Sequence, residues 1–552
     1  MNDFTFLKGS ADWWQNAIVY QIYPRSFKDS NGDGIGDLRG IISKVDYLAS
    51  LNIDAVWLSP FYPSALADGG YDVDDYRDVD PRIGTLAEFD EMVKKLHAEG
   101  IRVIVDIVPN HSGSNHVWFQ EALRSPKGSP ARDRYIFRDG LGENGDIRPS
   151  ELASHFGPTA WTRITEPDGT PGQWYMHLFA KEQPDFNWDN PEVREDFLKT
   201  IEFWCDRGVD GFRVDVAHAL TKQLDPLPER QSFDISVMKD DGTDTLFDRD
   251  EVHEIYKSWR EVFNRYDPPR MAVAEAWVHA NRRAPYASTA ELGQSFNFDM
   301  LGAGWNIGNV KRLAKYNLNE ASKQGSSTTW VLSNHDVIRH ATRLMIPTQN
   351  DVAGWFKNHR FNHNLDLELG VKRAKAMTMA LFALPGSTYI YQGEELGLHE
   401  HLTIQDKDMQ DPQFFRNPEL GLSRDGCRVP LPWNRFEPGF GFGSAEPHLP
   451  QPGWYESVAV DAQDGNAHST LTFYRNALGL RRKLITGDSW SIKNHLLRPN
   501  VLHVVRPGGW HSFTNFGTKP FKLPAGDVLL SSEPLVNGAL TADTTVWIRA
   551  RG

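Results

Sequence analysis

Short runs of β-branched and aromatic residues alternate with stretches of helical periodicity from about residue 18 to residue 395. Leu86–Glu99 shows this periodicity, with apolar residues at positions i, i+3, i+4 and i+7 counted from Phe89. The runs that predict strands are Ile18–Tyr23, Asp54–Leu58, Arg102–Ile107, Asp210–Val216, Met271–Ala274, Ser295–Phe298, Thr329–Leu332 and Ser387–Tyr391. Eight strands, each followed by helical sequence, predict an α/β fold, a closed parallel (β/α)8 TIM barrel. An open doubly wound sheet is the alternative that this pattern leaves.

Two long stretches interrupt the alternation. Residues 112–182 are rich in Gly, Pro, Ser and charged residues, which predicts an inserted subdomain after strand 3; residues 397–460 predict a second excursion after strand 8. A helix at Leu471–Leu484 is followed by apolar runs that predict a C-terminal antiparallel β-domain: Val501–Val505, Asp527–Leu530 and Thr545–Ile548. The 552 residues therefore divide into a barrel at 1–111 and 183–486, a subdomain at 112–182 and a β-domain at 487–552.

The net charge and the cysteine content indicate which partners and which cellular compartment to expect. Lys plus Arg number 59 and Asp plus Glu number 73, which gives a net charge of −14. An acidic chain lacks the basic surface that nucleic acids and anionic membranes require, so we expect neither as a partner. Only two cysteines occur, the N-terminus has no secretory pattern, and no run of about 18 apolar residues is present. We expect a cytoplasmic protein, and its oligomeric state is not readable.

Three carboxylates follow predicted strands, where barrel enzymes carry their reacting groups: Asp215, Glu275 and Asp336. Arg213 lies two residues before Asp215, so both side chains point to one face and the arginine keeps the carboxylate ionised, as a nucleophile needs. Partial burial of Glu275 behind an apolar run favours the protonated form that a general acid needs. Two such carboxyl groups about 5 Å apart carry out retaining glycoside hydrolysis. A helix N-cap or a salt bridge is the alternative for any one of them.

The sequence blocks around these residues form a specific set: DIVPNH at 106–111, QPDFNW at 183–188, GFRVDVAH at 211–218, AEAW at 274–277 and LSNHD at 332–336. In this order the blocks resemble those of α-glucosidases in the α-amylase superfamily, the family 13 glycoside hydrolases. The resemblance covers nearly the whole chain. It implies a retaining, exo-acting α-glucosidase that releases glucose from the non-reducing ends of small α-glucosides, through a covalent glucosyl-enzyme.

The resemblance also implies a role for individual residues. Asp215 matches the nucleophile, Glu275 the acid/base and Asp336 the third carboxylate. Asp68 and Arg428 match the pair that closes the pocket around a terminal glucose, which is why we expect removal of one glucose at a time. The implied substrate-binding residues are Asp68, Tyr71, His111, Phe156, Phe179, Gln183, Arg213, Val216, His335 and Arg428.

The preferred linkage and the fate of the glucosyl-enzyme stay open. Val216 resembles the residue of α-1,6-specific members, whereas the segment Arg424–Trp433 and the ending Val216–His218 resemble bacterial maltases of broad preference. We expect maltose and malto-oligosaccharides to be favoured. An oligo-1,6-glucosidase, or a transglucosylase or sucrose isomerase with the same intermediate, is the alternative. A non-catalytic amylase-like subunit is the alternative from another class, but such relatives lack intact carboxylates and carry a membrane helix.

A second constellation is the loop 29–37, where oxygen-bearing side chains alternate with small residues. Its twelfth position is Gly40 rather than the Glu of an EF-hand, and it follows a strand. It resembles instead the single-cation site of this family branch, which implies the ligands Asp29, Asn31, Asp33, Asp37 and the carbonyl of Ile35. We expect structural Ca²⁺, with Mg²⁺ as the alternative and no organic cofactor. A solvated Asn-Gly/Asp-Gly turn is the simpler interpretation.

Overall fold

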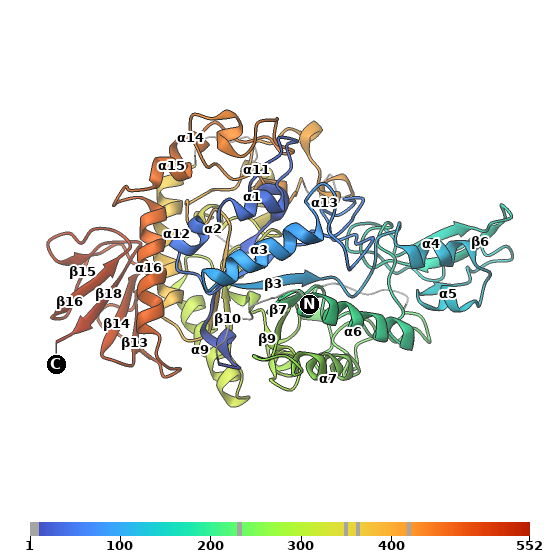
Figure 1. The fold of residues 1–552 in the computed structure, drawn as a ribbon. Helices are drawn as coiled ribbons and strands as arrows, with labels where there is room; N and C mark the ends of the chain where they lie inside the picture. The colour runs from blue at the N-terminus through green and yellow to red at the C-terminus, as the bar shows by residue number, and fades with distance from the viewer. Residues whose placement is uncertain (1–9, 229–233, 347–351, 360–364, 417–420, 552) are drawn as a thin grey trace.

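Eight parallel strands form the centre of the molecule (Figure 1). The computed structural model describes residues 10–551 except 229–233, 347–351, 360–364 and 417–420. The strands are β1 (Ile18–Ile22), β2 (Ala55–Leu58), β3 (Arg102–Ile107), β7 (Gly211–Val214), β8 (Met271–Ala274), β9 (Gly293–Ser295), β10 (Thr329–Val331) and β11 (Ser387–Tyr391). They are ordered β10-β11-β1-β2-β3-β7-β8-β9, so the last two strands pair back onto the first. This wrap-around order confirms the predicted barrel and excludes the doubly wound sheet.

The barrel is nearly closed, because side chains join the two strands at the ends of this order. The backbone N–H of Asn297 donates to Thr329 Oγ1 at 2.8 Å, and that hydroxyl donates to the carbonyl of Ser295 at 3.2 Å. The sixth strand was wrongly predicted as Ser295–Phe298. Strand β9 ends at Ser295 instead, and Phe298 begins a 3-10 helix (Phe298–Gly302) whose N-cap is Asn297. An Asn side chain that caps a following turn competes with strand pairing.

Alternate residues of the strands face opposite sides of the barrel wall, and both sides are buried. Val19, Trp57, Ile104, Val273 and Tyr389 lie in one buried cluster. Their neighbours along the same strands belong to the larger cluster under the helices. Strands buried on both faces are continuously apolar, which is why they could be predicted from the sequence.

Helices cover the barrel wall (Figure 1). Their bounds are α1 (Leu38–Ile42), α2 (Val45–Ser50), α3 (Leu86–Ala98), α6 (Pro191–Asp206), α7 (Val252–Phe263), α8 (Arg283–Ala287), α9 (Ile307–Lys323), α10 (His340–Arg343), α11 (Val352–His359), α12 (Leu367–Phe382), α13 (Pro412–Arg416), α14 (Tyr455–Val458), α15 (Val460–Gln463) and α16 (Thr470–Leu484). Helix α3 begins with a capping box between Thr85 and Glu88, as its sequence indicates. None of the helices in the described ranges has the length and apolar character needed to cross a membrane.

The segment between β3 and α6 forms a small subdomain at the right of Figure 1, beyond the end of β3. Its elements are α4 (Val117–Arg124), α5 (Pro130–Asp133), β4 (Phe137–Arg138), β5 (Trp161–Thr165) and β6 (Pro171–Met176). The strands form an antiparallel sheet of order β4-β6-β5. An insertion at this point of a barrel lies over its C-terminal face, where it contributes one wall of a substrate cavity.

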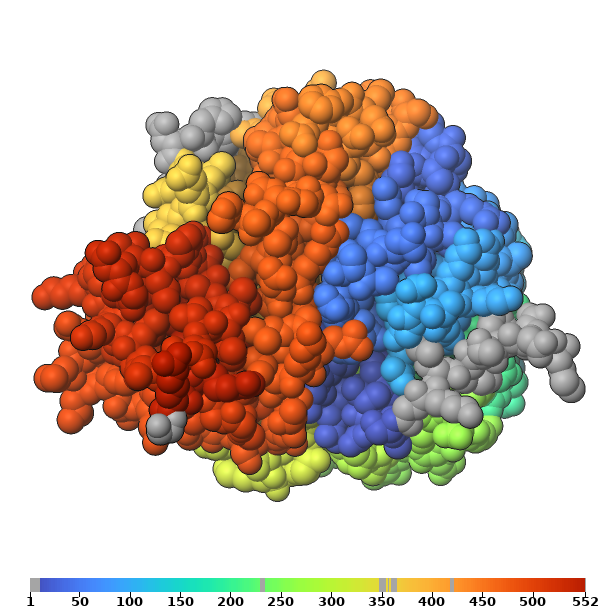
Figure 2. All heavy atoms as spheres, turned by 60° about the vertical axis from the view of Figure 1, so that its left-hand side comes forward, coloured from blue at the N-terminus to red at the C-terminus, as the bar shows by residue number. Residues whose placement is uncertain are grey.

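The C-terminal part of the chain is an antiparallel sheet of order β12-β13-β14-β18-β16, which Figure 2 shows as a red lobe beside the orange segment that precedes it. Its strands are β12 (Ser491–Lys493), β13 (Val501–Arg506), β14 (Trp510–Asn515), β16 (Gly526–Ser531) and β18 (Thr544–Ala550), and a separate pair is β15 (Phe521–Lys522) with β17 (Ala539–Leu540). Thr545 Oγ1 and Trp547 Nε1 of β18 donate to carbonyls of α12, at 2.7 and 3.2 Å. The sheet is thus anchored to a barrel helix.

Candidate active site

The predicted carboxylates meet in one cavity at the carboxyl ends of the barrel strands. Asp215 follows β7 directly, Glu275 follows β8 directly, and Asp336 lies in the loop after β10. The cavity measures about 380 Å³, and the subdomain provides part of its wall. Its lining residues are Asp68, Tyr71, His111, His155, Phe156, Phe179, Asp215, Val216, His218, Met238, Phe247, Glu275, Trp277, Asp336, Val337, Gln413 and Arg424. Of the predicted substrate-binding residues, only Gln183, Arg213, His335 and Arg428 are absent from this lining.

Arg213 lies beneath the cavity and holds both reacting carboxyl groups. Its Nη1 lies 2.6 Å from Asp215 Oδ1, and its Nη2 lies 2.6 Å from Glu275 Oε2. A third carboxylate, Asp106 at the end of β3, contacts the same Nη1 at 2.9 Å. The guanidinium is only 3 % exposed, so these ion pairs are screened little by water. The two terminal nitrogens of this guanidinium group thus hold the nucleophile and the acid/base in a fixed position relative to each other.

The electrostatics of this cluster favour one shared proton. Burial raises the pKa of Asp215 well above its ordinary value; Arg213 opposes this, and the carboxyl group of Glu275, with which Asp215 shares a hydrogen bond, reinforces it. Burial likewise raises the pKa of Asp106 to about 7, against the opposing effect of Arg213. Neighbouring carboxyl groups in one buried site do not both ionise readily. The raised pKa of Asp215 runs against the prediction that Arg213 keeps this carboxylate ionised, because burial and the neighbouring carboxyl groups outweigh the guanidinium. Retaining hydrolysis requires the nucleophile of such a pair to be ionised and the acid to be protonated.

Asp336 is held as a carboxylate. Burial raises its pKa, but His335 and the guanidinium groups of Arg424 and Arg428 outweigh burial, and the pKa lies well below its ordinary value. His335 Nε2 lies 3.1 Å from Asp336 Oδ2 and 2.6 Å from the Tyr71 hydroxyl. The amide nitrogen of Gln21 contacts Nδ1 of the same ring at 2.7 Å, which assigns the ring proton to Nε2.

Asp68 closes the inner end of the cavity together with an arginine, but not the one predicted. Asp68 Oδ1 pairs with Arg424 Nη2 at 2.7 Å. The same Nη2 lies 2.7 Å from Asp411 Oδ1. Arg428 pairs instead with Asp336, at 2.9 Å, and donates to the carbonyl of His335. The predicted Asp68–Arg428 pair is therefore wrong in its arginine, while the charged wall itself is present.

The remaining predicted residues lie around Asp68. The His111 ring lies between the amide groups of Asn110 and Gln183, each 3.1 Å away, and burial lowers its pKa to about 3, so the ring is neutral. Gln183 also donates to Asp68 Oδ2 at 3.2 Å, although its side chain is buried behind the cavity. The rings of Phe156 and Phe179 line the cavity with centroids 5.8 Å apart. The cluster offers polar groups for sugar hydroxyls and apolar faces for the sugar ring.

Val216 has a strained backbone beside the nucleophile. Its φ is +43°, a value that β-branched residues rarely adopt. The strain points its N–H at Glu275 Oε2, to which it donates at 3.1 Å. The family blocks indicated Val216 as a contact residue, but no local sequence signal indicates this conformation.

Several residues of the cavity lining were not predicted from the sequence. They come from separated segments of the chain: His155, His218, Met238, Phe247, Trp277, Val337, Gln413 and Arg424. Trp277, His218 and Arg424 belong to segments that the sequence singled out, but no role was predicted for these three residues. The others lie in loops, where apolar periodicity gives no position, and an alignment of relatives is the signal that could have found them.

The loop 29–37 contains the predicted cation ligands in a hydrogen-bonded turn. Asp29 Oδ1 accepts from the N–H groups of Asn31 and Gly32, and Asp37 Oδ1 caps α1 by accepting from Gly40 N at 2.6 Å. Asp29, Asp33 and Asp37 make no ion pair within the described ranges, and the described residues contain no preformed group of three or more metal ligands. The hard oxygen donors fit Ca²⁺ by type, but the carboxylates are directed at backbone N–H groups.

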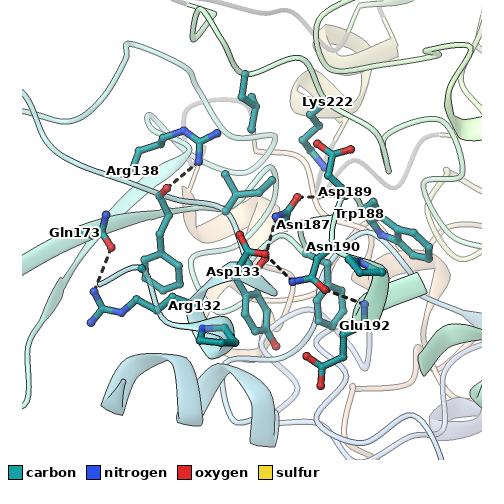
Figure 3. A pocket seen from close by; sticks show the side chains of 18 of the residues that line it. Arg132, Asp133, Arg138, Gln173, Asn187, Trp188, Asp189, Asn190, Glu192 and Lys222 are labelled. Atoms are coloured by element: carbon teal, nitrogen blue, oxygen red, sulfur yellow. Dashed lines mark hydrogen bonds between the residues drawn. The ribbon is translucent and has the colours of Figure 1, made fainter. Parts of the chain in front are cut away.

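A larger cavity, of about 930 Å³, lies between the subdomain and the segments 186–192 and 220–225 (Figure 3). Its polar groups bond to one another: Asn190 Nδ2 donates to Asp133 Oδ2 at 2.8 Å, and Arg132 Nη1 donates to Gln173 Oε1 at 3.2 Å. It contains none of the three strand-end carboxylates. This cavity is the larger of the two, but the smaller cavity holds the three carboxylates and is therefore the candidate active site.

Comparisons with known proteins agree with this geometry. Residues 21–487 match the family model described as the α-amylase catalytic domain. An oligo-1,6-glucosidase of Parageobacillus thermoglucosidasius is 34% identical over 506 residues, covering 85% of this chain and 84% of that protein. A trehalose-6-phosphate hydrolase of Escherichia coli (strain K12) is 37% identical over 495 residues, covering 85% of this chain and 84% of that protein.

Solved structures extend the likeness to transfer enzymes. The crystal structure of an alpha-glucosyl transfer enzyme superposes with a TM-score of 0.82 at 31% identity, covering 98% of this chain and 100% of that one. A trehalulose synthase mutant gives the same TM-score at 28% identity, with the same coverage. The family model spans most of the chain, and three carboxylates and Arg213 lie together at the strand ends. The chain therefore belongs to the α-amylase family and is a glycoside hydrolase.

Proposed function

We propose that this enzyme is a retaining, exo-acting α-glucosidase that releases glucose from the non-reducing ends of small α-glucosides. The observation that carries the proposal is the Asp215–Arg213–Glu275 cluster opposite the Asp68–Arg424 wall in one cavity. Asp215 attacks the anomeric carbon, the bond to the leaving oxygen breaks, and that oxygen takes the proton of Glu275. Water then attacks the glucosyl-enzyme and gives its proton to Glu275. Two inversions leave the anomeric configuration retained.

The closed inner end supports removal of a single glucose. Arg424, Asp68 and Asp411 form a network whose side chains are 12 %, 6 % and 0 % exposed. A chain that continues past the terminal ring would have to displace this buried network, so the cavity favours a non-reducing end. We expect glucose as the only early product from maltoheptaose, measured by chromatography of the first turnovers. Maltose or maltotriose as first products would contradict the proposal.

The cavity lining favours an uncharged aglycone. Among the residues that the structure describes, Arg424 is the one Lys or Arg in the lining, and Asp68 and Asp411 already neutralise it. Burial lowers the pKa of His155 and of His218 to about 4, so neither ring is a cation at neutral pH. A sugar phosphate needs a cationic partner. We therefore propose neutral disaccharides rather than the phosphorylated substrate that the Escherichia coli relative is named for.

The linkage preference depends on the outer cavity. We propose maltose as the favoured disaccharide, with an oligo-1,6-glucosidase as the alternative. Transfer to a second sugar is also open, because the structural relatives include a glucosyl transfer enzyme. A panel of maltose, isomaltose, sucrose, trehalose and kojibiose, with hydrolysis and transfer products resolved, separates these activities.

Val216 provides a test of linkage. Its side chain lines the cavity beside Glu275, and Val216→Thr keeps the shape while adding a hydroxyl group. We expect the kcat/KM ratio of maltose to isomaltose to rise by about threefold to tenfold, because one polar contact changes discrimination by about 1 kcal/mol. An aryl α-glucoside serves as the control, since it has no second sugar ring. An unchanged ratio would remove Val216 from linkage selection.

We further propose that the loop 29–37 binds Ca²⁺, with Mg²⁺ as the alternative. Three carboxylates without an ion-pair partner in the described ranges leave a local negative charge that a cation would compensate. Chelation should lower Tm, because a ligand at about 100 times its Kd stabilises the folded state by about 2.7 kcal/mol. The kcat/KM measured below Tm should change less than about twofold. An Asp33→Ala variant with an unchanged response to chelation, or no metal in the purified protein, would contradict the proposal.

We also propose a cytoplasmic enzyme with small sugars as its partners and neither nucleic acid nor membrane. The support is the net charge of −14 and the cavity of about 380 Å³, a size that suits a small sugar. Cell fractionation tests the location, and size-exclusion chromatography with light scattering gives the oligomeric state.

A further inference from the structure

Trp277 lies two residues after Glu275 and forms part of the cavity wall. Its ring stacks on Phe298 with centroids 4.4 Å apart and planes at 21°, yet the residue is 41 % exposed. A tryptophan held this firmly but left open on one side does not contribute mainly to the core. Its indole Nε1 donates to Glu275 Oε1 at 3.2 Å.

The two oxygens of the Glu275 carboxyl group have different surroundings. Oε2 accepts from the Val216 N–H at 3.1 Å and contacts Arg213 Nη2 at 2.6 Å. A carboxyl oxygen has two lone-pair directions, and donors already occupy both at Oε2. A proton cannot reside on Oε2 without displacing one of them. The carboxyl group of Asp215 also shares a hydrogen bond with Glu275. The two donors at Oε2 make Oε1 the oxygen that carries the proton of the acid form.

Trp277 is the partner of that second oxygen. Its N–H occupies one lone pair of Oε1 and leaves the other direction for the proton. We infer that Trp277 is a positioning residue: its indole N–H fixes the rotation of the Glu275 carboxyl group, so that the proton on Oε1 is directed at the glycosidic oxygen. This inference rests on the proposed α-glucosidase function and concerns the first half of the reaction.

The contact matters most while the proton moves. As the bond between the anomeric carbon and the leaving oxygen breaks, its electron pair passes to that oxygen, which takes the proton from Oε1. Glu275 is then a carboxylate, and the indole N–H faces the oxygen on which negative charge develops. A preorganised donor at such an atom stabilises the transition state more than the ground state. A leaving group that departs without protonation does not use this interaction.

The experiment compares two substrates with Trp277→Phe, which keeps an aromatic ring on Phe298 but removes the indole N–H together with the second ring. For maltose, whose leaving group must be protonated, we expect kcat/KM to fall by about tenfold or more, since hydrogen bonds to charged groups contribute at least this factor. For 2,4-dinitrophenyl α-glucoside, whose leaving group needs no proton, we expect a change below about twofold. Because kcat/KM covers only substrate binding and formation of the glucosyl-enzyme, the second half of the reaction does not obscure the comparison.

Trp305→Phe is the matched control. Trp305 also stacks on a phenylalanine, Phe516 at 4.3 Å, and its indole nitrogen has no hydrogen-bond partner among the described residues. It lies outside the cavity lining, so we expect neither substrate to respond. An equal loss on both substrates with Trp277→Phe, or no loss on maltose, would overturn the inference. An unmutated enzyme that hydrolyses neither substrate would instead contradict the proposed function.

Discussion

We expect Asp215→Asn to lower kcat/KM by about four powers of ten on every α-glucoside, because it removes the nucleophile and preserves the shape of the side chain. The amide still reaches Arg213, which lies 2.6 Å from Asp215 Oδ1, so the fold should be retained. Steady-state kinetics on maltose and on an aryl α-glucoside measure the loss, and circular dichroism checks the fold. A loss below about tenfold on both substrates would move the nucleophile to another carboxylate.

Glu275→Gln is the companion variant, with a different expected pattern. It should be severely impaired on maltose but much less so in kcat/KM for activated aryl glucosides, whose leaving groups need no proton. Azide added to this variant should yield α-glucosyl azide, because the azide replaces water in the second of two inversions. The β-azide from the same reaction would exchange the roles assigned to Glu275 and Asp215.

Arg424→Ala should have the second largest effect. It leaves Asp68 and Asp411 as buried carboxylates without the cation that lies 2.7 Å from each. Loss of one partner of a buried ion pair costs about 3 to 5 kcal/mol, so we expect kcat/KM for maltose to fall by about two to four powers of ten. Part of the loss should appear in kcat, because a terminal glucose held less firmly is aligned less well with Asp215.

Arg416→Ala is the matched control for that variant. Arg416 pairs with Glu182 at 3.0 Å, and the two side chains are 25 % and 31 % exposed. A solvent-accessible pair contributes about 0 to 1 kcal/mol, so we expect kcat/KM to change less than about fivefold. Equal losses for the two variants would assign the Arg424 effect to general loss of charge rather than to the closed end of the cavity.

The sequence by itself determined the barrel, the C-terminal sheet and the strand-end carboxylates. Strands buried on both faces are continuously apolar, and a residue that follows such a strand lies at the carboxyl end of the barrel in any correct fold. Asp215 and Glu275 were therefore predictable from local patterns, and residues two apart on one strand share a face, which placed Arg213 beside Asp215. The bounds predicted for the sixth strand were wrong because Asn297 caps a turn within an apolar run.

Only the tertiary structure decided which groups meet across the cavity. Arg424 and Arg428 lie four residues apart around a 3-10 turn (Asp425–Cys427), and no local pattern indicates which of them faces Asp68. The packing of the loop against Asp411 places Arg424 on both Asp68 and Asp336 and places Arg428 on Asp336. The hydrogen bond from Trp277 to Glu275 likewise depends on the stacking of its ring on Phe298. Such contacts follow from three-dimensional packing, because side chains distant in sequence meet only once the barrel has closed.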